Sequence, residues 1–279
     1  MKIALLSGKG GTGKTNISVN LFENLKNATL IDTDVEEPNS HLYFDTKISK
    51  TIDVTKKYPI IDMSKCTLCG KCGDFCNFNA IIPTKKKVIV FKDLCHECLG
   101  CKIVCEENAI SFDDKLTGKI FNHTVDNKQF LYGDLEVGEV SGVKIIEKLR
   151  EITKDENILL IDSPPGTSCS AVSSVSEVDY AIVIAEPTPF GVSDLKMVVT
   201  MLRDINIPFG VVINKAFTGS KEIYDYLVCE NIELIEEIKF DKEFANISGS
   251  GELISKKSVY FKEKIQNIIR KVLGDEYVS

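Results

Sequence analysis

Short apolar runs alternate with segments of helical spacing along much of the chain. Five apolar runs predict buried strands, at residues 2–7, 30–34, 157–162, 181–185 and 210–214. Apolar residues recur at helical spacing in residues 16–21, 141–152, 224–228 and 259–273. Strands that alternate with helices are typical of a parallel sheet with crossover helices. The pattern therefore predicts an α/β fold.

The middle of the chain interrupts this alternation. Residues 46–58 are polar and rich in lysine, which indicates the edge of a domain. Residues 119–121 and 129–132 return to a strand-like pattern and suggest a hairpin or strand pair. The main domain therefore resumes after a long intervening segment.

A glycine-rich octet follows the first predicted strand and leads into the first predicted helix. It matches the pattern G-x-x-x-x-G-K-[ST], and this strand–loop–helix context makes the pattern a nucleotide site rather than an ordinary turn. Glycines let consecutive backbone N–H groups face phosphate oxygens, and the helix N-terminus favours negative charge. We expect Lys14 to reach the β- and γ-phosphates and Thr15 to hold Mg²⁺. The predicted nucleotide-binding residues are Gly8, Gly10, Gly11, Thr12, Gly13, Lys14 and Thr15.

Composition limits the class of protein. The 279 residues, 43% hydrophobic and 27% charged, suit a globular protein with one large domain, or one with a small insertion. A net charge of −7 argues against a nucleic-acid partner. No apolar run is long enough to span a bilayer, and the first strand begins at the N-terminus, so we expect no signal peptide and a cytoplasmic location. In that setting, ten cysteines favour metal or redox chemistry over disulfides.

Eight of the cysteines form two matched runs with the spacing C-x₂-C-x₂-C-x₃-C. The runs lie 29 residues apart, and each is followed by Asn-Ala-Ile after two intervening residues. Zinc is an alternative ligand, because C-x₂-C pairs also build tetrahedral sites. The candidate metal ligands are Cys66, Cys69, Cys72 and Cys76 in the first run and Cys95, Cys98, Cys101 and Cys105 in the second.

The octet G-K-G-G-T-G-K-T resembles the deviant P-loop of the MinD/ParA family and of the nitrogenase iron protein. In that family the early lysine crosses a twofold axis to the nucleotide of the partner subunit. The resemblance therefore implies an ATPase that forms a homodimer, in which Lys9 completes the partner's site.

The acidic ends of two predicted strands resemble the switch regions of the same family. By this resemblance Asp34 orients the attacking water, and Asp32 supports Mg²⁺ and Thr15. Asp162 resembles the Walker B aspartate, which binds Mg²⁺ through water, and Gly166 is expected to approach the γ-phosphate with its N–H. Acids at strand ends also serve as turn and cap residues, and it is the P-loop that favours the functional interpretation.

Asn214 and Lys215 resemble the purine-binding position of the family. A guanine site would require an aspartate two residues after Lys215, but residue 217 is a phenylalanine, Phe217. ATP is therefore favoured over GTP.

The cysteine runs resemble the bacterial two-cluster ferredoxin over residues 58–113. In that fold the fourth cysteine of each run crosses to the other cluster. The resemblance implies two 4Fe–4S clusters, whose ligand sets are Cys66, Cys69, Cys72 and Cys105, and Cys95, Cys98, Cys101 and Cys76. The whole chain then resembles a P-loop NTPase domain (residues 1–57 and 114–279) with a small inserted α+β ferredoxin-type domain (residues 58–113).

These resemblances favour an ATP-gated protein that transfers electrons to or from an unidentified redox protein. A cluster-assembly scaffold or carrier that delivers to an apo-protein is the strongest alternative, and a redox-sensing switch is a third. The Mrp-type carriers hold a bridging cluster with a late C-x-x-C pair, whereas here only Cys169 and Cys229 follow Cys105. Cys169 lies near the predicted second switch, and we favour a plain thiol there over a ligand of a cluster that bridges two subunits. Cys229 is expected in the core.

The amphipathic segment 259–273 allows two interpretations. MinD proper touches membranes with such a helix, and lysines and an arginine lie along this segment. Packing on the sheet is the ordinary use of such a stripe, and we favour it over membrane contact.

Overall fold

The main sheet of the computed structural model has nine strands. The structure describes residues 1–219 and 221–279. The strands are β1 (Lys2–Leu6), β2 (Ala28–Asp32), β3 (Ile48–Ile61), β6 (Ile110–Val125), β7 (Lys128–Leu135), β8 (Ile158–Asp162), β9 (Tyr180–Ala185), β10 (Phe209–Ala216) and β11 (Leu234–Lys239). They lie in the order β11-β10-β9-β1-β8-β2-β7-β6-β3, with β1 near the centre.

Most of the sheet is parallel, which confirms the predicted α/β fold. Every neighbouring pair from β11 to β7 is parallel, whereas β6 runs antiparallel to both β7 and β3. The predicted hairpin is also confirmed, because β6 and β7 pair up to Val125 and Lys128. Its two-residue turn has positive φ at Asp126 (47°) and Asn127 (66°), the backbone that a type I′ hairpin turn requires.

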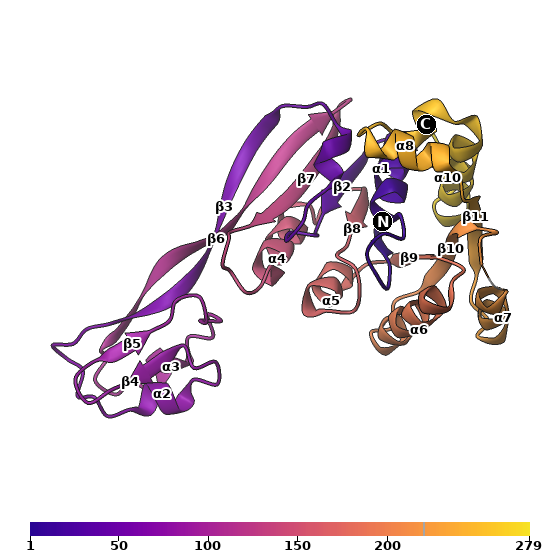
Figure 1. Cartoon of the computed structure of the whole chain (residues 1–279). Helices are drawn as coiled ribbons and strands as arrows, with labels where there is room; N and C mark the ends of the chain where they lie inside the picture. The colour runs from indigo at the N-terminus through magenta and orange to yellow at the C-terminus, as the bar shows by residue number, and fades with distance from the viewer. Residues whose placement is uncertain (220) are drawn as a thin grey trace.

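Helices cover both faces of the sheet (Figure 1). The first face carries α1 (Lys14–Asn24), α9 (Ile254–Lys257) and α10 (Val259–Val272), whose apolar side chains share one buried cluster. The second carries α4 (Val143–Ile152), α5 (Cys169–Val175), α6 (Pro189–Asp204) and α7 (Glu222–Cys229). Three further elements complete this part: the helix α8 (Lys242–Gly249) and the short 3₁₀ helices η1 (Ser40–Tyr43) and η2 (Asp275–Tyr277).

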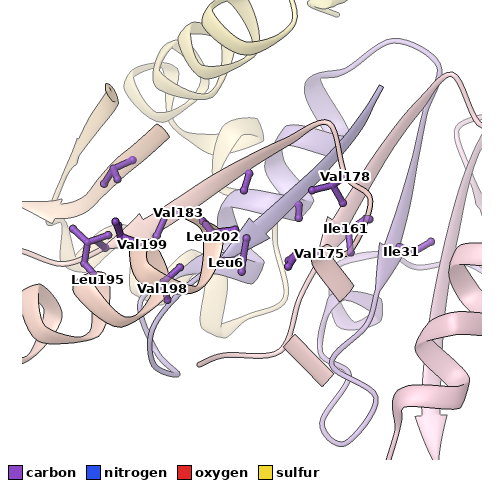
Figure 2. Packing of buried hydrophobic residues seen from close by; sticks show 14 of the residues in the cluster. Leu6, Ile31, Ile161, Val175, Val178, Val183, Leu195, Val198, Val199 and Leu202 are labelled. Atoms are coloured by element: carbon purple, nitrogen blue, oxygen red, sulfur yellow. The ribbon is translucent and has the colours of Figure 1, made fainter. Parts of the chain in front are cut away.

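The core of the second face is built from strand and helix side chains in alternation (Figure 2). Leu6, Ile161 and Val183 project from neighbouring strands and meet Val199 and Leu202 of α6, and all five side chains are almost fully buried. Each such side chain contributes about 1.5–3 kcal/mol by leaving water. This packing fixes the strand ends from which the site residues project.

The C-terminal helix uses its apolar stripe inside the protein. Phe261, Ile265, Ile268 and Ile269 of α10 are buried against the first face of the sheet. The stripe is thus occupied by intramolecular packing, as the favoured interpretation expects. Within residues 1–219 and 221–279, the structure contains no helix with the length and apolar character needed to span a membrane.

The sequence analysis assigned no strand to residues 46–58, the predicted domain edge. They lie largely within β3, which pairs with β6 from Ile48 opposite His123 to Ile61 opposite Ile110. The buried side chains alternate as Val54, Lys56 and Tyr58, so a lysine occupies one of the inward positions. That lysine hid the two-residue period that marks a strand.

The cysteine-rich segment, residues 62–109, lies at the far end of the β3–β6 ribbon, away from the main sheet (Figure 1). It contains α2 (Lys71–Phe75), α3 (Gly100–Ile103) and a small antiparallel sheet of β4 (Ile81–Pro83) and β5 (Val88–Val90). The predicted boundaries fall at the same level of the ribbon, because Lys57 pairs with Asp114 and Tyr58 with Asp113. The division into domains there remains a prediction.

Val35, next to the predicted catalytic Asp34, is buried against a glycine at the start of α4. A Cβ on Gly142 would lie only 2.1 Å from Cγ2 of Val35. The Val35 carbonyl also accepts a hydrogen bond from the Leu135 N–H at 2.9 Å. The loop that joins β7 to α4 is therefore fixed at both ends against the residue that follows Asp34.

We predict that Gly142→Ala lowers the free energy of unfolding by about 1–3 kcal/mol, because the added methyl overlaps Val35. The backbone itself tolerates alanine, since φ at Gly142 is −87°. Urea unfolding followed by circular dichroism measures the change. Gly249→Ala is the matched control, because a Cβ there meets nothing within 4 Å. Equal stability of the two variants would contradict the packing of Val35 on Gly142.

Candidate functional site

The P-loop turns from β1 into α1 with a backbone that needs glycine. Gly13 caps α1 with φ of 90°, and a Cβ there would lie 2.3 Å from Nδ2 of Asn214. The hydroxyl of Thr12 is buried and has no hydrogen-bond partner in the part of the chain that the structure describes. A buried unpaired hydroxyl in this loop suits a phosphate-binding turn, because a phosphate oxygen would satisfy it.

Three predicted site residues meet at the carboxyl ends of β2 and β8. Lys14 Nζ lies 2.5 Å from Oδ1 of Asp162, and both side chains are buried. Asp32 accepts hydrogen bonds from the backbone N–H groups of Asp34 (3.0 Å), Asn39 (3.2 Å) and Ser40 (3.0 Å). The Ser40 hydroxyl donates to Oδ2 of Asp162 at 3.1 Å, which joins the two acids. The sequence analysis missed Ser40, since nothing in the local pattern distinguishes it from other serines.

The electrostatics of this cluster favour a bound cation. Burial, and then the nearby charge of Asp162, hold the pKa of the Asp32 carboxyl well above its usual range. Burial likewise raises the pKa of Asp34 to about 6. Carboxylates and a hydroxyl are the hard oxygen donors that Mg²⁺ prefers, and a cation here would stabilise the ionised acids. This set of oxygen donors therefore fits Mg²⁺. Thr15, the other predicted Mg²⁺ ligand, lies in the first turn of α1, directly after Lys14.

Gly166 does not present a free N–H in this structure. Its N–H donates to the Ser7 carbonyl at 2.8 Å, and its φ is 83°. The predicted contact with a γ-phosphate therefore requires this hydrogen bond to break. A loop that exchanges one partner for another is suited to sensing the third phosphate.

Lys9 is held by its own chain. Its Nζ lies 3.3 Å from Oε2 of Glu186, and Lys215 pairs with the other oxygen of the same carboxylate at 2.5 Å. Lys215 also donates to the Gly11 carbonyl at 2.8 Å. Glu186 thus links the P-loop to the end of β9, and the sequence analysis gave it no such role.

A cavity beside the P-loop is lined in part by Asn214, the predicted purine-binding residue. Asn214 enters it from β10 and donates to the Thr12 carbonyl at 2.7 Å. Phe244, which lies on α8 and follows Asn214 by 30 residues in the sequence, lines the same cavity. The remaining side chains, which the sequence analysis missed, include Lys239, Phe240, Asp241 and Ser248.

The eight cysteines of the two runs line two separate cavities. One is lined by Cys66, Cys69, Cys72 and Cys105, and the other by Cys76, Cys95, Cys98 and Cys101. The structure therefore brings together three thiols of one run and the fourth of the other, in both cases. No three His, Cys, Asp or Glu side chains of residues 1–219 and 221–279 converge closely enough to hold a single metal ion.

The backbone of the two runs repeats as the sequence does. Positive φ recurs at positions 29 residues apart, at Leu68 (58°) and Glu97 (55°), and at Gly70 (86°) and Leu99 (59°). Leucine and glutamate rarely adopt this conformation, so the loop geometry overrides their preference. The N–H of Ala109 donates to Cys105 Sγ at 3.3 Å, and burial raises the pKa of the Cys101 thiol to about 11.

The two cysteines outside the runs are both exposed. Cys229, at the end of α7, was expected in the core, and that prediction was wrong. Its neighbours Ile223 and Leu227 take the buried face of the helix, so the last turn presents Cys229 to solvent. Cys169 is the first residue of α5.

Comparison with known proteins identifies the family of the chain. Residues 3–254 match the CobQ/CobB/MinD/ParA nucleotide binding domain. An uncharacterized protein of Methanocaldococcus jannaschii is 34% identical over 244 residues, which is 85% of this chain and 88% of that protein. An iron-sulfur cluster carrier protein of the same organism is 28% identical over 222 residues, 76% of this chain but only 59% of that protein.

A solved structure gives the same result for the fold. The septum site-determining protein MinD of Pyrococcus horikoshii, complexed with Mg-ADP, superposes with a TM-score of 0.60 and 18% identity over 98% of this chain and 96% of that chain. At this identity the likeness concerns the fold. The family match over residues 3–254 shows that the chain belongs to the CobQ/CobB/MinD/ParA family of nucleotide-binding domains.

Proposed function

We propose that this protein is an ATP-gated iron–sulfur protein, in which the nucleotide state of a homodimer controls electron transfer through two 4Fe–4S clusters. One observation carries the proposal. Two cavities, each lined by four cysteines, lie in the segment at the far end of the β3–β6 ribbon, and these two strands belong to the sheet whose β1 leads into the P-loop. Hydrogen-bonded strands therefore connect the predicted nucleotide site to the cysteines without a break.

The nucleotide site is assigned the following roles. Lys14 leaves Asp162 to bind the β- and γ-phosphates, and Thr15 and Asp162 hold Mg²⁺, the latter through water. Mg²⁺ supplies charge neutralisation at the phosphates. Asp32, held by three backbone N–H groups, supports the Mg²⁺ shell. Asn214 contacts the adenine.

Hydrolysis then proceeds by attack of water on the γ-phosphorus. Asp34 orients that water, the bond to the β-phosphate oxygen breaks, and ADP and inorganic phosphate are the products. Gly166 donates its N–H to the γ-phosphate after releasing Ser7. Loss of the γ-phosphate returns that N–H to Ser7, so hydrolysis is expected to reset the second switch.

The cysteine cavities suit cubane clusters. A 4Fe–4S cube has four irons ligated separately, and each cavity offers four thiols around one space. The eight cysteines would hold the clusters as thiolates, and burial, which raises the pKa of Cys101, keeps that thiol protonated in the absence of iron. When bound, the clusters supply one-electron redox chemistry. The N–H of Ala109 on Cys105 Sγ favours negative charge on that sulfur and so tunes the potential.

A cluster carrier is the second candidate, and the names of several relatives favour it. Iron-sulfur cluster carrier proteins of Methanocaldococcus jannaschii and Aquifex aeolicus are 28% and 24% identical to this chain. Transfer of an intact cluster would need thiols that can release it. Exposed Cys69 and Cys98 meet that requirement better than buried Cys101 does. A carrier would deliver clusters to an apo-protein, whereas the gated protein exchanges electrons with a redox partner.

We predict that cluster-loaded protein contains about eight irons per chain. Because the ligand sets are crossed, Cys76→Ala and Cys95→Ala should remove the same electron paramagnetic resonance signal of the reduced protein. Cys66→Ala should remove the other signal. Cys229→Ala, at an exposed cysteine outside the runs, is the control and should leave both signals. Loss of one shared signal in Cys76→Ala and Cys66→Ala contradicts the crossed assignment, and bound zinc contradicts the clusters.

We predict that Lys9→Ala binds ATP but loses most ATP-dependent dimerisation, because Lys9 must leave Glu186 and reach the partner's nucleotide. Lys14→Ala should lose nucleotide affinity directly. Sedimentation velocity with ATP in an Asp34→Ala background, where hydrolysis is slow, measures both effects. Lys85→Ala, on the exposed turn between β4 and β5, is the control. If Lys9→Ala dimerises as well as this control does, Lys9 has no role across the interface.

A further inference from the structure

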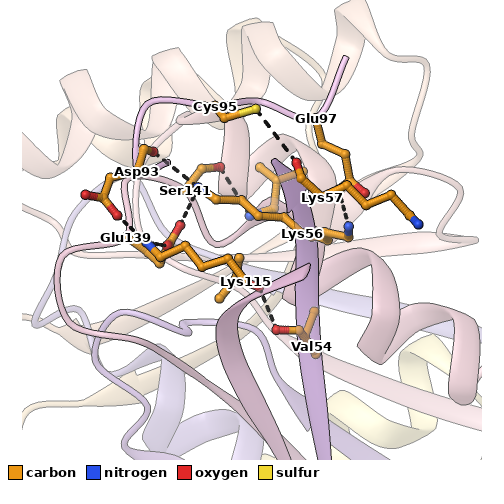
Figure 3. Close-up of polar contacts among 12 residues, drawn as sticks. Val54, Lys56, Lys57, Asp93, Cys95, Glu97, Lys115, Glu139 and Ser141 are labelled. Atoms are coloured by element: carbon orange, nitrogen blue, oxygen red, sulfur yellow. Dashed lines mark hydrogen bonds and ion pairs between the residues drawn. The ribbon is translucent and has the colours of Figure 1, made fainter. Parts of the chain in front are cut away.

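A buried carboxylate stands where the cysteine-bearing ribbon meets the main body. Glu139 lies in the loop 136–142 between β7 and α4, and its side chain is only 2% exposed. Its Oε2 lies 2.7 Å from Nζ of Lys56 on β3, and its Oε1 pairs with Lys115 on β6. One carboxylate thus clamps both strands of the ribbon (Figure 3).

The same two lysines reach the cysteine-rich segment. Lys56 donates to the Asp93 carbonyl at 3.2 Å, and Lys115 pairs with the Asp93 carboxylate. Two residues further on, the Cys95 thiol donates to the Lys57 carbonyl at 3.7 Å. A second ion pair also holds this loop, because Lys144 of α4 pairs with Glu97. The loop that carries Cys95 is therefore held on both sides by groups outside the cysteine-rich segment.

The loop that carries Glu139 is in turn fixed to the first switch. Its start follows Leu135, whose N–H bonds to the Val35 carbonyl, and its end is Gly142, which packs on the Val35 side chain. In between, the Glu136 N–H donates to the Thr117 carbonyl at 2.9 Å. Val35 follows the predicted catalytic Asp34 directly. Movement of the switch must therefore move this loop or break its packing.

We propose that Glu139 is the positioning residue that couples the first switch to the loop of Cys95, through Lys56 and Lys115. When the γ-phosphate shifts Asp34 and Val35, the loop 136–142 follows, and Glu139 carries the two lysines and the loop 93–97 with it. The second cavity, lined by Cys76, Cys95, Cys98 and Cys101, is the one that responds. This inference rests on the proposed function, because it explains how nucleotide state reaches a cluster.

Burial identifies Glu139 as the member of the network that matters. Asp93 is 64% exposed, so its ion pair is largely screened by water and contributes little. Glu139 has almost no contact with water, and removing its charge leaves two lysines without their buried counter-ion. Coupling requires an element with different contacts in the two states, and the proposal assigns that role to the ion pairs of Glu139 with Lys56 and Lys115.

The test is amide hydrogen exchange of cluster-loaded protein, with Mg-ADP and with a non-hydrolysable ATP analogue. In the parent, residues 93–97 should exchange at rates that differ at least threefold between the two nucleotides. Glu139→Gln should abolish most of that difference while the P-loop still responds. Glu136→Gln, which removes an exposed charge from the same loop, is the control and should behave as the parent does. Lys115→Gln, at a partly exposed lysine, should lose the difference as Glu139→Gln does and guards against misfolding of that variant.

The outcomes separate the inference from the function on which it rests. If the parent shows the difference at residues 93–97 and both Glu139→Gln and Lys115→Gln keep it, the role of Glu139 is wrong and nucleotide gating stands. If the parent itself shows no difference at residues 93–97, nucleotide gating of this cluster fails together with the inference.

Discussion

The antiparallel pairing of β3 with β6 is the constraint on which the rest of this structure depends. It begins inside the nine-stranded sheet and continues, from Ile48 opposite His123 to Ile61 opposite Ile110, until it reaches the cysteine-rich segment. Each backbone hydrogen bond contributes only about 1 kcal/mol net, but a ladder of this length acts cooperatively. Without it, eight cysteines would be tethered to a nucleotide-binding domain and not oriented by it.

Two groups of ion pairs complement the ribbon. In the predicted nucleotide site, Lys14 pairs with Asp162 and Lys9 with Glu186, so both predicted phosphate-binding lysines are already engaged by carboxylates. At the ribbon's junction, Glu139 pairs with two lysines. Under the proposed function, a bound nucleotide displaces the ion pairs of Lys14 and Lys9, and the ion pairs of Glu139 pass the shift to the cysteine-rich segment. Phosphate and Mg²⁺ contacts then supply the free energy for both changes.

The sequence predicted the features that depend on local spacing. The P-loop octet, the apolar strands and the cysteine repeat are each specified within a few residues. The structure confirms the strands, whereas the roles of the glycines and thiols remain predictions. The sequence analysis missed β3, because Lys56 faces inward and is stabilised by Glu139, 83 residues later in the chain. It also missed Ser40, the ion pairs of Glu186, and Phe244 in the cavity beside Asn214, because these contacts arise only when distant segments meet. Cys229 was misplaced because helical spacing alone does not say which face of α7 is covered.

The most direct test of the account uses the reciprocity of coupling: if nucleotide changes the reduction potential, reduction must change nucleotide affinity by the same factor. Redox titration of the clusters with Mg-ADP and with a non-hydrolysable ATP analogue should give different potentials. The ratio of the affinities for the two nucleotides, measured by calorimetry on oxidised and on reduced protein, should change by the matching factor. ATP-gated electron transfer would be contradicted if the reduction potentials are the same with both nucleotides and the nucleotide affinities are the same in the oxidised and reduced protein.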